Sequence, residues 1–131
     1  MQTPLPTSND IAELLVFLPR LHAEGFYPIR KWHGGMPDAS DVITMPWPEY
    51  DEVVEEFFRA ASAECWSDHD YHPDEAGRML EDYDVVKNAT LSQIKTMITY
   101  CVRGERFCDG LWGGVIANGD VRRLLERLAA F

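Results

Sequence analysis

Apolar residues recur at helical spacing through most of the chain, which predicts a mainly α fold. In segments 91–102, 53–61 and 121–128 they fall three or four positions apart, so each segment has one apolar stripe. Segment 8–18 has the same pattern. We therefore expect a compact single domain over residues 1–131, built as a bundle of about five or six helices.

The ends of several helices are predicted from capping residues and prolines. Thr90 and Gln93 match a capping box, in which each side chain accepts a hydrogen bond from the backbone N–H of the other residue. Thr7 or Ser8 is placed to cap the first helix. Pro19 should kink or interrupt that helix, because proline has no N–H for the helical hydrogen bond, and we favour the kink.

Further boundaries are predicted in the middle and C-terminal parts of the chain. Pro48 is placed at the first position of the second main helix, and Asp74 is placed to cap a short helix after it. Gly104 should end the helix that Thr90 begins, in the left-handed conformation. Asp109 and Asp120 should cap the last two helices.

The stretch after the first helix has no clear helical pattern. Segments 27–29 and 42–45 are candidates for short strands, so a two-stranded β ribbon is the expected exception to the helical fold. The aromatic side chains of Trp32, His33 and Trp47 are expected to close over the helical core. An aromatic ligand pocket is the alternative interpretation.

Negative charge is concentrated in the middle of the chain. The whole sequence has a net charge of −10. Residues 41–86 hold fourteen acidic and two basic residues, a balance of −12, whereas residues 1–40 contribute −1 and residues 87–131 contribute +3. Nucleic acid binds through its phosphates to basic surfaces, so we expect no direct binding of nucleic acid. A strongly negative segment instead attracts basic protein surfaces.

The carboxylates of the second main helix lie on one face, opposite its apolar stripe. Such a face is either an ordinary solvated surface or a negative stripe that meets the basic surface of a partner. Four carboxylates within two turns repel one another, although their position near the N-terminus of the helix offsets part of this repulsion through the helix dipole. The predicted partner-binding residues come from this face and from the loop that follows the helix: Asp51, Glu52, Glu55, Glu56, Asp68 and Asp70.

A short charged turn contains Arg103, Glu105, Arg106 and Asp109. One interpretation is a ligand clamp, in which two guanidiniums hold a phosphate or carboxylate and a neighbouring carboxyl group acts as an acid or base. The other is an internal lock, in which the arginines pair with carboxylates and with the free carbonyls of the helix end. We favour the lock, because no nucleophile or set of metal ligands accompanies the arginines in the sequence.

The run RGERFCDG at residues 103–110, followed by a helix, Asn118-Gly119 and a leucine-rich last helix, resembles DUF6508. This is a family of small bacterial and phage proteins of unknown function. Met45-Pro46, before an aromatic and acidic helix, also resembles the middle of that family. The resemblance covers roughly the last 90 residues. It implies a small, mostly helical domain and no established activity, so it carries no catalytic residue over to this chain.

The loop around His69 and His72 contains residue types that bind metal ions, with Asp68 or Asp74 as further candidate ligands. The histidines are only three positions apart, and the sequence has no second cluster that would complete a set of four ligands. These features favour an ordinary polar loop. We therefore predict no metal and no other cofactor.

Cysteine usage and hydropathy indicate a cytoplasmic protein. The three cysteines have no C-x-x-C spacing, which is typical of reduced thiols. The sequence contains no apolar run near the ~20 residues that a membrane-spanning helix needs, and no recognisable signal peptide.

The sequence thus favours a non-enzymatic protein-interaction module, either an inhibitor or an adaptor, that binds a basic surface of a nucleic-acid-binding protein. It has no recognised catalytic motif. Phage-encoded inhibitors of host defences, including anti-CRISPR proteins, resemble this chain in size and charge only. The alternatives are a small enzyme or ligand-binding protein that uses the charged turn, and a homo-oligomer such as a homodimer. A patch that contains Trp47, Trp66 or Trp112 would form the contact in the homo-oligomer.

Overall fold

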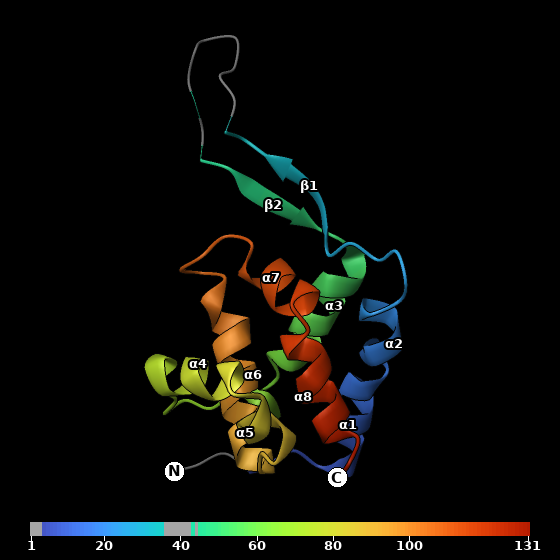
Figure 1. Cartoon of the computed structure of the whole chain (residues 1–131), viewed down its shortest axis with the longest axis vertical. Coiled ribbons are helices and arrows are strands. Elements are labelled where there is room, and N and C mark those ends of the chain that lie inside the picture. The colour runs from blue at the N-terminus through green and yellow to red at the C-terminus, as the bar shows by residue number, and fades with distance from the viewer. Residues whose placement is uncertain (1–3, 36–42, 44) are drawn as a thin grey trace.

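Helices make up most of the chain in the computed structural model, which describes residues 4–35, 43 and 45–131 (Figure 1). The helices are α1 (Ser8–Leu15), α2 (Phe17–Leu21), α3 (Glu52–Ala61), α4 (Pro73–Glu81), α5 (Tyr83–Lys87), α6 (Leu91–Gly104), α7 (Leu111–Ala117) and α8 (Asp120–Leu128), with a 3-10 turn, η1 (Glu64–Trp66). The strands are β1 (Ile29–His33) and β2 (Trp47–Tyr50). The prediction of a mainly α domain is confirmed. None of the described helices combines the length and the apolar character needed to cross a membrane.

Helix α6 lies at the centre of the helical body. It contacts α3, α4, α7, α8 and η1. Thr90 and Gln93 form the predicted capping box at its start. Ile94 and Met97, on the apolar stripe of α6, are fully buried. Cys101 is also buried, and this burial raises the pKa of its thiol to about 12. The apolar stripe predicted from the sequence is therefore the face that meets the core.

A short break at Val16 separates α1 from α2. Thr7 caps α1 in a capping box: its hydroxyl accepts from the N–H of Asp10 at 3.2 Å, and the Asp10 carboxylate accepts from the N–H of Thr7 at 2.8 Å. Pro19 has no N–H to donate to the carbonyl of Leu15, so the first helix is interrupted just before it. Of the two outcomes predicted for this segment, the structure shows the interruption and not the favoured kink.

Helix α3 begins later than the sequence indicated. Pro48 lies in β2, opposite Trp32 of β1, and does not open the helix. The N-cap is Asp51, whose carboxylate accepts from the N–H of Val53 at 3.0 Å. The fixed φ of proline also suits an extended backbone, and pairing with β1 keeps the chain extended through Tyr50.

The cap predicted for α4 is also wrong. Pro73 takes the first position of α4, and His72 precedes it as an N-cap without a side-chain hydrogen bond. Asp74 lies within the first turn, where its negative charge interacts favourably with the helix dipole. Asp82 caps the next helix, α5, by accepting from the N–H of Asp84 at 3.1 Å.

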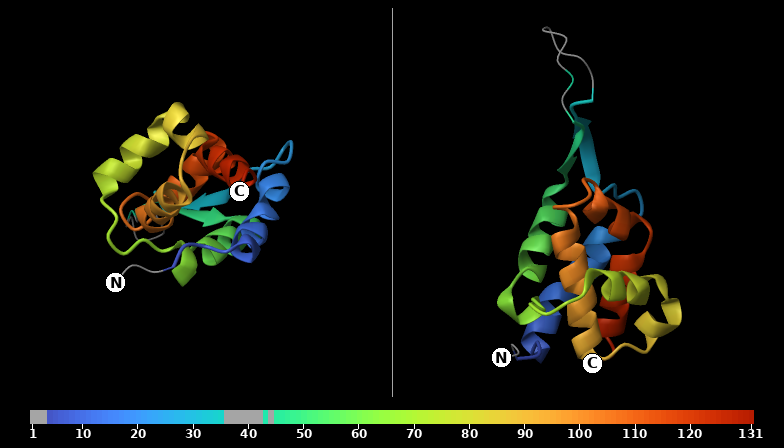
Figure 2. Two further views of the ribbon diagram at one scale, coloured as in Figure 1. Left: turned by 90° about the horizontal axis from the view of Figure 1, so that it is seen from below. Right: turned by 90° about the vertical axis from the view of Figure 1, so that its left-hand side faces the viewer.

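Strands β1 and β2 form an antiparallel ribbon that projects beyond the helical body (Figures 1 and 2). His33 pairs with Trp47, and their rings stack with centroids 4.2 Å apart. The predicted ribbon is confirmed, although its strands lie further along the chain than the candidate segments. Residues 42 and 44 of segment 42–45 lie outside the described residues. Trp32 and Trp47 are 49% and 50% exposed, so the prediction that they close over the helical core is wrong. Both rings stay half exposed on the ribbon, and the ring of Trp32 lies against the backbone of Gly110 at the start of α7.

Candidate functional site

The acidic segment 41–86 presents most of its described carboxylates to solvent. Figure 2 (right) shows α3 on one side of α6 and α4 with α5 on the other. The exposed acidic residues are Glu52, Glu55, Glu56, Glu64, Asp70, Asp74, Glu75, Glu81, Asp82 and Asp84. Arg59 and Arg78 are the only basic residues of the segment. The segment itself therefore neutralises little of this negative surface.

Glu52, Glu55 and Glu56 form what we call the α3 acidic face, and all three are exposed. Glu56 pairs with Arg20 at 3.2 Å, and both side chains are about half exposed, so this pair contributes little to stability. Glu52 and Glu55 form no ion pair within the described part of the chain. The α3 acidic face is therefore available to a partner.

Two of the other predicted partner-binding carboxylates have structural roles. Asp51 caps α3, and its second carboxylate oxygen lies 3.7 Å from the guanidinium of Arg30. Asp68 is partly buried and accepts from the hydroxyl of Thr96 at 2.6 Å and from the N–H of Asp70 at 3.0 Å. Asp70 itself is exposed. Asp51 and Asp68 therefore hold the backbone in place rather than extend the exposed acidic surface.

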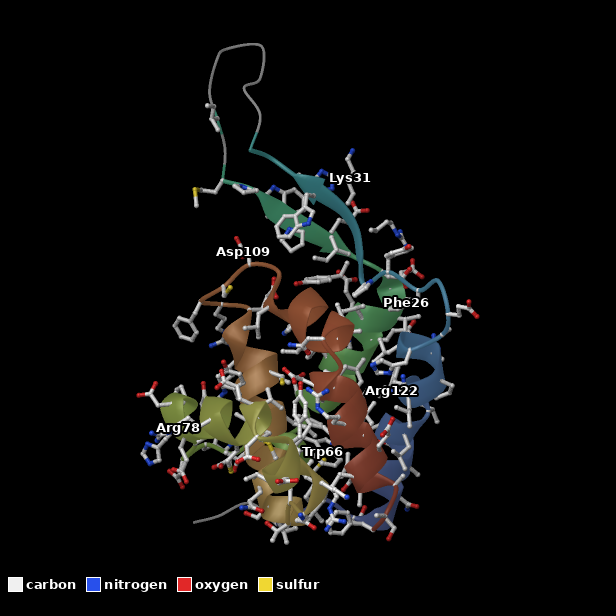
Figure 3. All side chains as sticks on the ribbon, in the orientation of Figure 1. Phe26, Lys31, Trp66, Arg78, Asp109 and Arg122 are labelled. Atoms are coloured by element: carbon white, nitrogen blue, oxygen red, sulfur yellow. The ribbon has the colours of Figure 1, made fainter. Side chains whose placement is uncertain are left out.

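Glu105 organises the charged turn between α6 and α7. Its carboxylate accepts from the hydroxyl of Tyr50 at 2.7 Å and from the N–H groups of Gly110 and Trp112, both at 2.9 Å. Gly110 is the N-cap of α7 and has a φ of 92°, which is a left-handed conformation. The N–H groups of Gly110 and Trp112 have no partner within the helix, and both donate to Glu105. Asp109, the predicted cap, lies on the outside of the turn (Figure 3). Burial, and then the hydrogen bond to Glu105, raise the pKa of Tyr50 well above its usual value.

Two other predictions about helix ends in this region are corrected. Gly104 is the last residue of α6 and does not adopt the left-handed conformation. A Cβ at Gly104 would overlap the side chain of Leu111, so the glycine permits close packing of α7. Gly119, with a φ of 89°, is the N-cap of α8. Asp120 is the first residue of that helix and pairs with Arg123.

The arginines of the turn do not build the lock that the sequence indicated. Arg103 lies over the ring of Tyr71, with its Cζ 5.3 Å from the centroid, and Arg106 is exposed. Neither guanidinium forms an ion pair among the residues that the structure describes. Hydrogen bonds within the protein hold the turn, but the carboxylate of Glu105 accepts them, and the arginines are not part of this network.

A surface groove of about 610 Å³ lies between α3 and the charged turn. Arg59 and Arg106 both line it, together with Phe58, Val102 and Trp112. Arg103 is not among the lining residues, so this groove does not bring Arg103 and Arg106 together in the way that the alternative clamp interpretation required. Sequence reasoning missed Arg59 as the partner of Arg106, because no local pattern connects α3 with a turn so distant along the chain.

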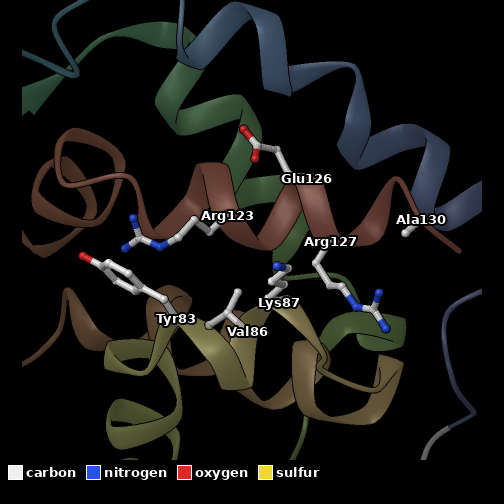
Figure 4. Close-up of a pocket in the computed structure, with 7 residues that line it drawn as sticks. All are labelled: Tyr83, Val86, Lys87, Arg123, Glu126, Arg127 and Ala130. Atoms are coloured by element: carbon white, nitrogen blue, oxygen red, sulfur yellow. The ribbon is translucent and has the colours of Figure 1, made fainter.

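A second pocket, of about 420 Å³, lies between α5 and α8 (Figure 4). Its two arginines do not converge. Arg123 extends to the ring of Tyr83, and the Cζ atom of Arg123 lies 4.0 Å from the ring centroid. Arg127 extends in another direction and donates to the carbonyl of Ala89 at 3.0 Å. The two arginines are thus engaged within the protein and are not arranged around one ligand.

The described residues contain no group of three or more His, Cys, Asp or Glu side chains placed to hold a metal ion. The Nε2 atom of His69 lies 2.7 Å from a carboxylate oxygen of Glu64. His72 is exposed at the start of α4, and the Asp68 carboxylate accepts the hydrogen bonds described above. The candidate metal ligands of this loop are therefore not brought together.

The tryptophans considered for a homo-oligomer contact lie in different environments. Trp66 is only 2% exposed and sits among the helices (Figure 3), so it cannot belong to a surface patch. Trp112 is partly buried, and its ring stacks on Phe58 with centroids 4.4 Å apart. Trp47, with Trp32, is the exposed candidate, on the projecting ribbon.

Comparison with known proteins identifies a family over almost the whole chain. The sequence profile of DUF6508, described as a family of unknown function, matches residues 6–131. The match extends closer to the N-terminus than the resemblance around residues 103–110 indicated. No curated protein and no solved structure matches this chain significantly. This chain belongs to DUF6508, a family of unknown function.

Proposed function

We propose that this protein is a non-enzymatic interaction module, acting as an inhibitor or adaptor, that binds a basic surface of a nucleic-acid-binding protein. The observation that supports the proposal is the α3 acidic face, which is exposed and carries a single ion pair within the described residues. Further exposed carboxylates on α4 and α5 extend the negative surface around the helical body. Such a surface favours association with positive charge.

The α3 acidic face is held on a rigid support. On the opposite side of the helix, Val54, Phe57 and Phe58 are buried in the core. The carboxylates therefore keep a fixed spacing and lose little backbone freedom when a partner binds. Carboxylates arranged along a helix resemble the phosphates of a nucleic acid strand in charge, so a basic groove that binds nucleic acid suits them.

The proposal includes inhibitors of the kind that phages use against host defences, such as anti-CRISPR proteins. This extension is an analogy that depends on size and charge alone. The partner's identity would test it directly, because an anti-defence inhibitor must bind a component of a defence system.

The first experiment is an affinity pull-down from a cell extract at ~50 mM and at ~1 M salt, with mass spectrometry of the bound proteins. The screening length falls to ~3 Å at 1 M, so binding through exposed charges should be lost. A specific partner should also be released by added DNA or RNA, because nucleic acid would compete for the same basic surface. A partner retained at high salt, or unaffected by nucleic acid, would contradict the proposal.

The second experiment locates the binding surface with charge reversals. The triple variant E52K/E55K/E56K should weaken binding to the captured partner at least tenfold, because three attractive contacts become repulsive. The control E13K/E24K/D109K makes the same change in net charge at exposed acidic residues outside the acidic segment. Equal loss of affinity in both variants would mean that net charge, and not the α3 acidic face, drives binding.

A further inference from the structure

The groove between α3 and the charged turn contains two arginines that form no ion pair with any residue that the structure describes. Arg59 and Arg106 are exposed, line the groove, and form no ion pair within the described residues. Most other arginines contact a carboxylate, a backbone carbonyl or an aromatic ring of the protein. Those of α2, β1 and α8 pair with carboxylates or a backbone carbonyl, and Arg103 lies over an aromatic ring. In a protein with so many carboxylates, two free guanidiniums beside one groove are well placed to bind an anion.

The floor of the groove is apolar and rigid. The Trp112 ring stacks on Phe58, which is 2% exposed, with an angle of 8° between the ring planes. The indole N–H of Trp112 donates to the carbonyls of Cys101 and Val102 at 3.1 and 3.2 Å, which fixes the orientation of the ring. The polar atom of the indole is thus already bonded, and the ring and the Val102 side chain offer apolar contact to a ligand.

The charges around the groove favour a singly charged anion over a doubly charged one. Glu55 and Glu105 line it together with Arg59 and Arg106, so the formal charges of the lining residues cancel. The Glu105 carboxylate already accepts three hydrogen bonds, from Tyr50, Gly110 and Trp112. A doubly charged phosphate would meet stronger repulsion from the two glutamates than a carboxylate would.

We propose that this groove binds a small organic carboxylate that carries an apolar ring. The carboxylate lies between the guanidiniums of Arg59 and Arg106, and the ring packs against Val102 and Trp112. The groove borders the α3 acidic face and shares Glu55 with it, but the proposal does not depend on the one made for a protein partner.

The test is a titration of the purified protein with 3-phenylpropionate, followed by two-dimensional NMR of backbone and indole N–H signals. Two related probes separate the contributions: 3-phenylpropylamine keeps the ring and reverses the charge, and propionate keeps the carboxylate without the ring. We expect saturable shifts at the indole N–H of Trp112 and in α3 near Arg59 with 3-phenylpropionate. The amine should cause none at these positions, and propionate should bind at least tenfold more weakly.

Variants test the roles of the two arginines. R59Q and R106Q should each weaken binding of 3-phenylpropionate about tenfold, as expected for the loss of one charge-assisted hydrogen bond. R78Q removes the other basic residue of the acidic segment, which is exposed on α4 and outside the groove, so binding should be unchanged. Arg59 and Arg106 are exposed, so melting temperatures should match that of the wild type and show that the variants fold.

Three results would overturn the proposal: no saturable shift with 3-phenylpropionate, equal binding by R59Q, R106Q and the wild type, or equal shifts with the amine. Because the titration uses the purified protein alone, each of these results leaves the proposed interaction with a protein partner untouched.

Discussion

Replacement of Glu105 by glutamine should destabilise the protein substantially, although the two side chains have nearly the same size. The carboxylate accepts from Tyr50 and Trp112 through one oxygen and from Gly110 through the other. Glutamine keeps one oxygen, but its amide nitrogen cannot accept. In E105Q, therefore, the N–H of Gly110 faces another donor, and the two remaining hydrogen bonds lose a charged acceptor.

The expected loss follows from these three contacts. An unpaired buried donor costs ~1–3 kcal/mol, and hydrogen bonds to a charged acceptor exceed neutral ones by ~1 kcal/mol. Glu105 is partly exposed, so water compensates for some of the loss. We expect the free energy of unfolding to fall by about 2–3 kcal/mol. For a domain of this size, the melting temperature should fall by about 10 °C.

The assay is urea unfolding followed by circular dichroism, with two matched variants. Y50F removes one of the three donors and should cost about 1 kcal/mol. D109N changes the residue that the sequence indicated as the cap, which lies on the outer side of the turn, and should change stability by less than ~0.5 kcal/mol. If E105Q is as stable as the wild type, or if D109N is as destabilised as E105Q, the assignment of Glu105 as the organiser of the turn is wrong.

Two further predictions concern packing and pH. G104A should lower the free energy of unfolding by about 1 kcal/mol, because the added Cβ would overlap Leu111. The Cβ added in G114A meets open space within a helix, so this variant should raise the free energy of unfolding by about 0.5–1 kcal/mol. Urea unfolding of both variants measures these changes, and equal effects would contradict the packing argument. Burial lowers the pKa of His22 below 6.5, although its Nδ1 lies 3.0 Å from the carbonyl of Leu18. The unfolded chain therefore binds that proton more readily, so stability should fall as the pH drops below 6.5, and H22Q should reduce this dependence between pH 7 and pH 5.5. An unchanged slope in H22Q would assign the pH dependence to other groups.

Much of the secondary structure could be predicted because its causes lie within a few residues along the chain. The capping boxes at Thr7 and Thr90 use partners three positions away, and the apolar stripe of α6 repeats with each turn. Pro19 interrupts the first helix through its own missing N–H. The exposure of the acidic segment could also be expected, because isolated carboxylates are costly to bury.

The wrong predictions concern residues that have more than one favourable environment. Pro48 suits both a first helical turn and an extended strand, and its pairing in the ribbon decides between them. Aspartates at positions 74, 109 and 120 are plausible caps, but Pro73, Gly110 and Gly119 set where the helices begin. Local preferences differ by only ~1 kcal/mol in such cases, so tertiary contacts determine the outcome.

The sequence by itself determined the helical class, most of the apolar stripes, the acidic surface and the family. The tertiary structure alone decided that Glu105 receives the hydroxyl of Tyr50, that Arg59 and Arg106 line one groove, and that Trp47 is exposed while Trp66 is buried. The physical reason is distance along the chain. Periodicity and capping act between near neighbours, whereas these contacts join residues that meet only when α3, the ribbon and the C-terminal helices pack together.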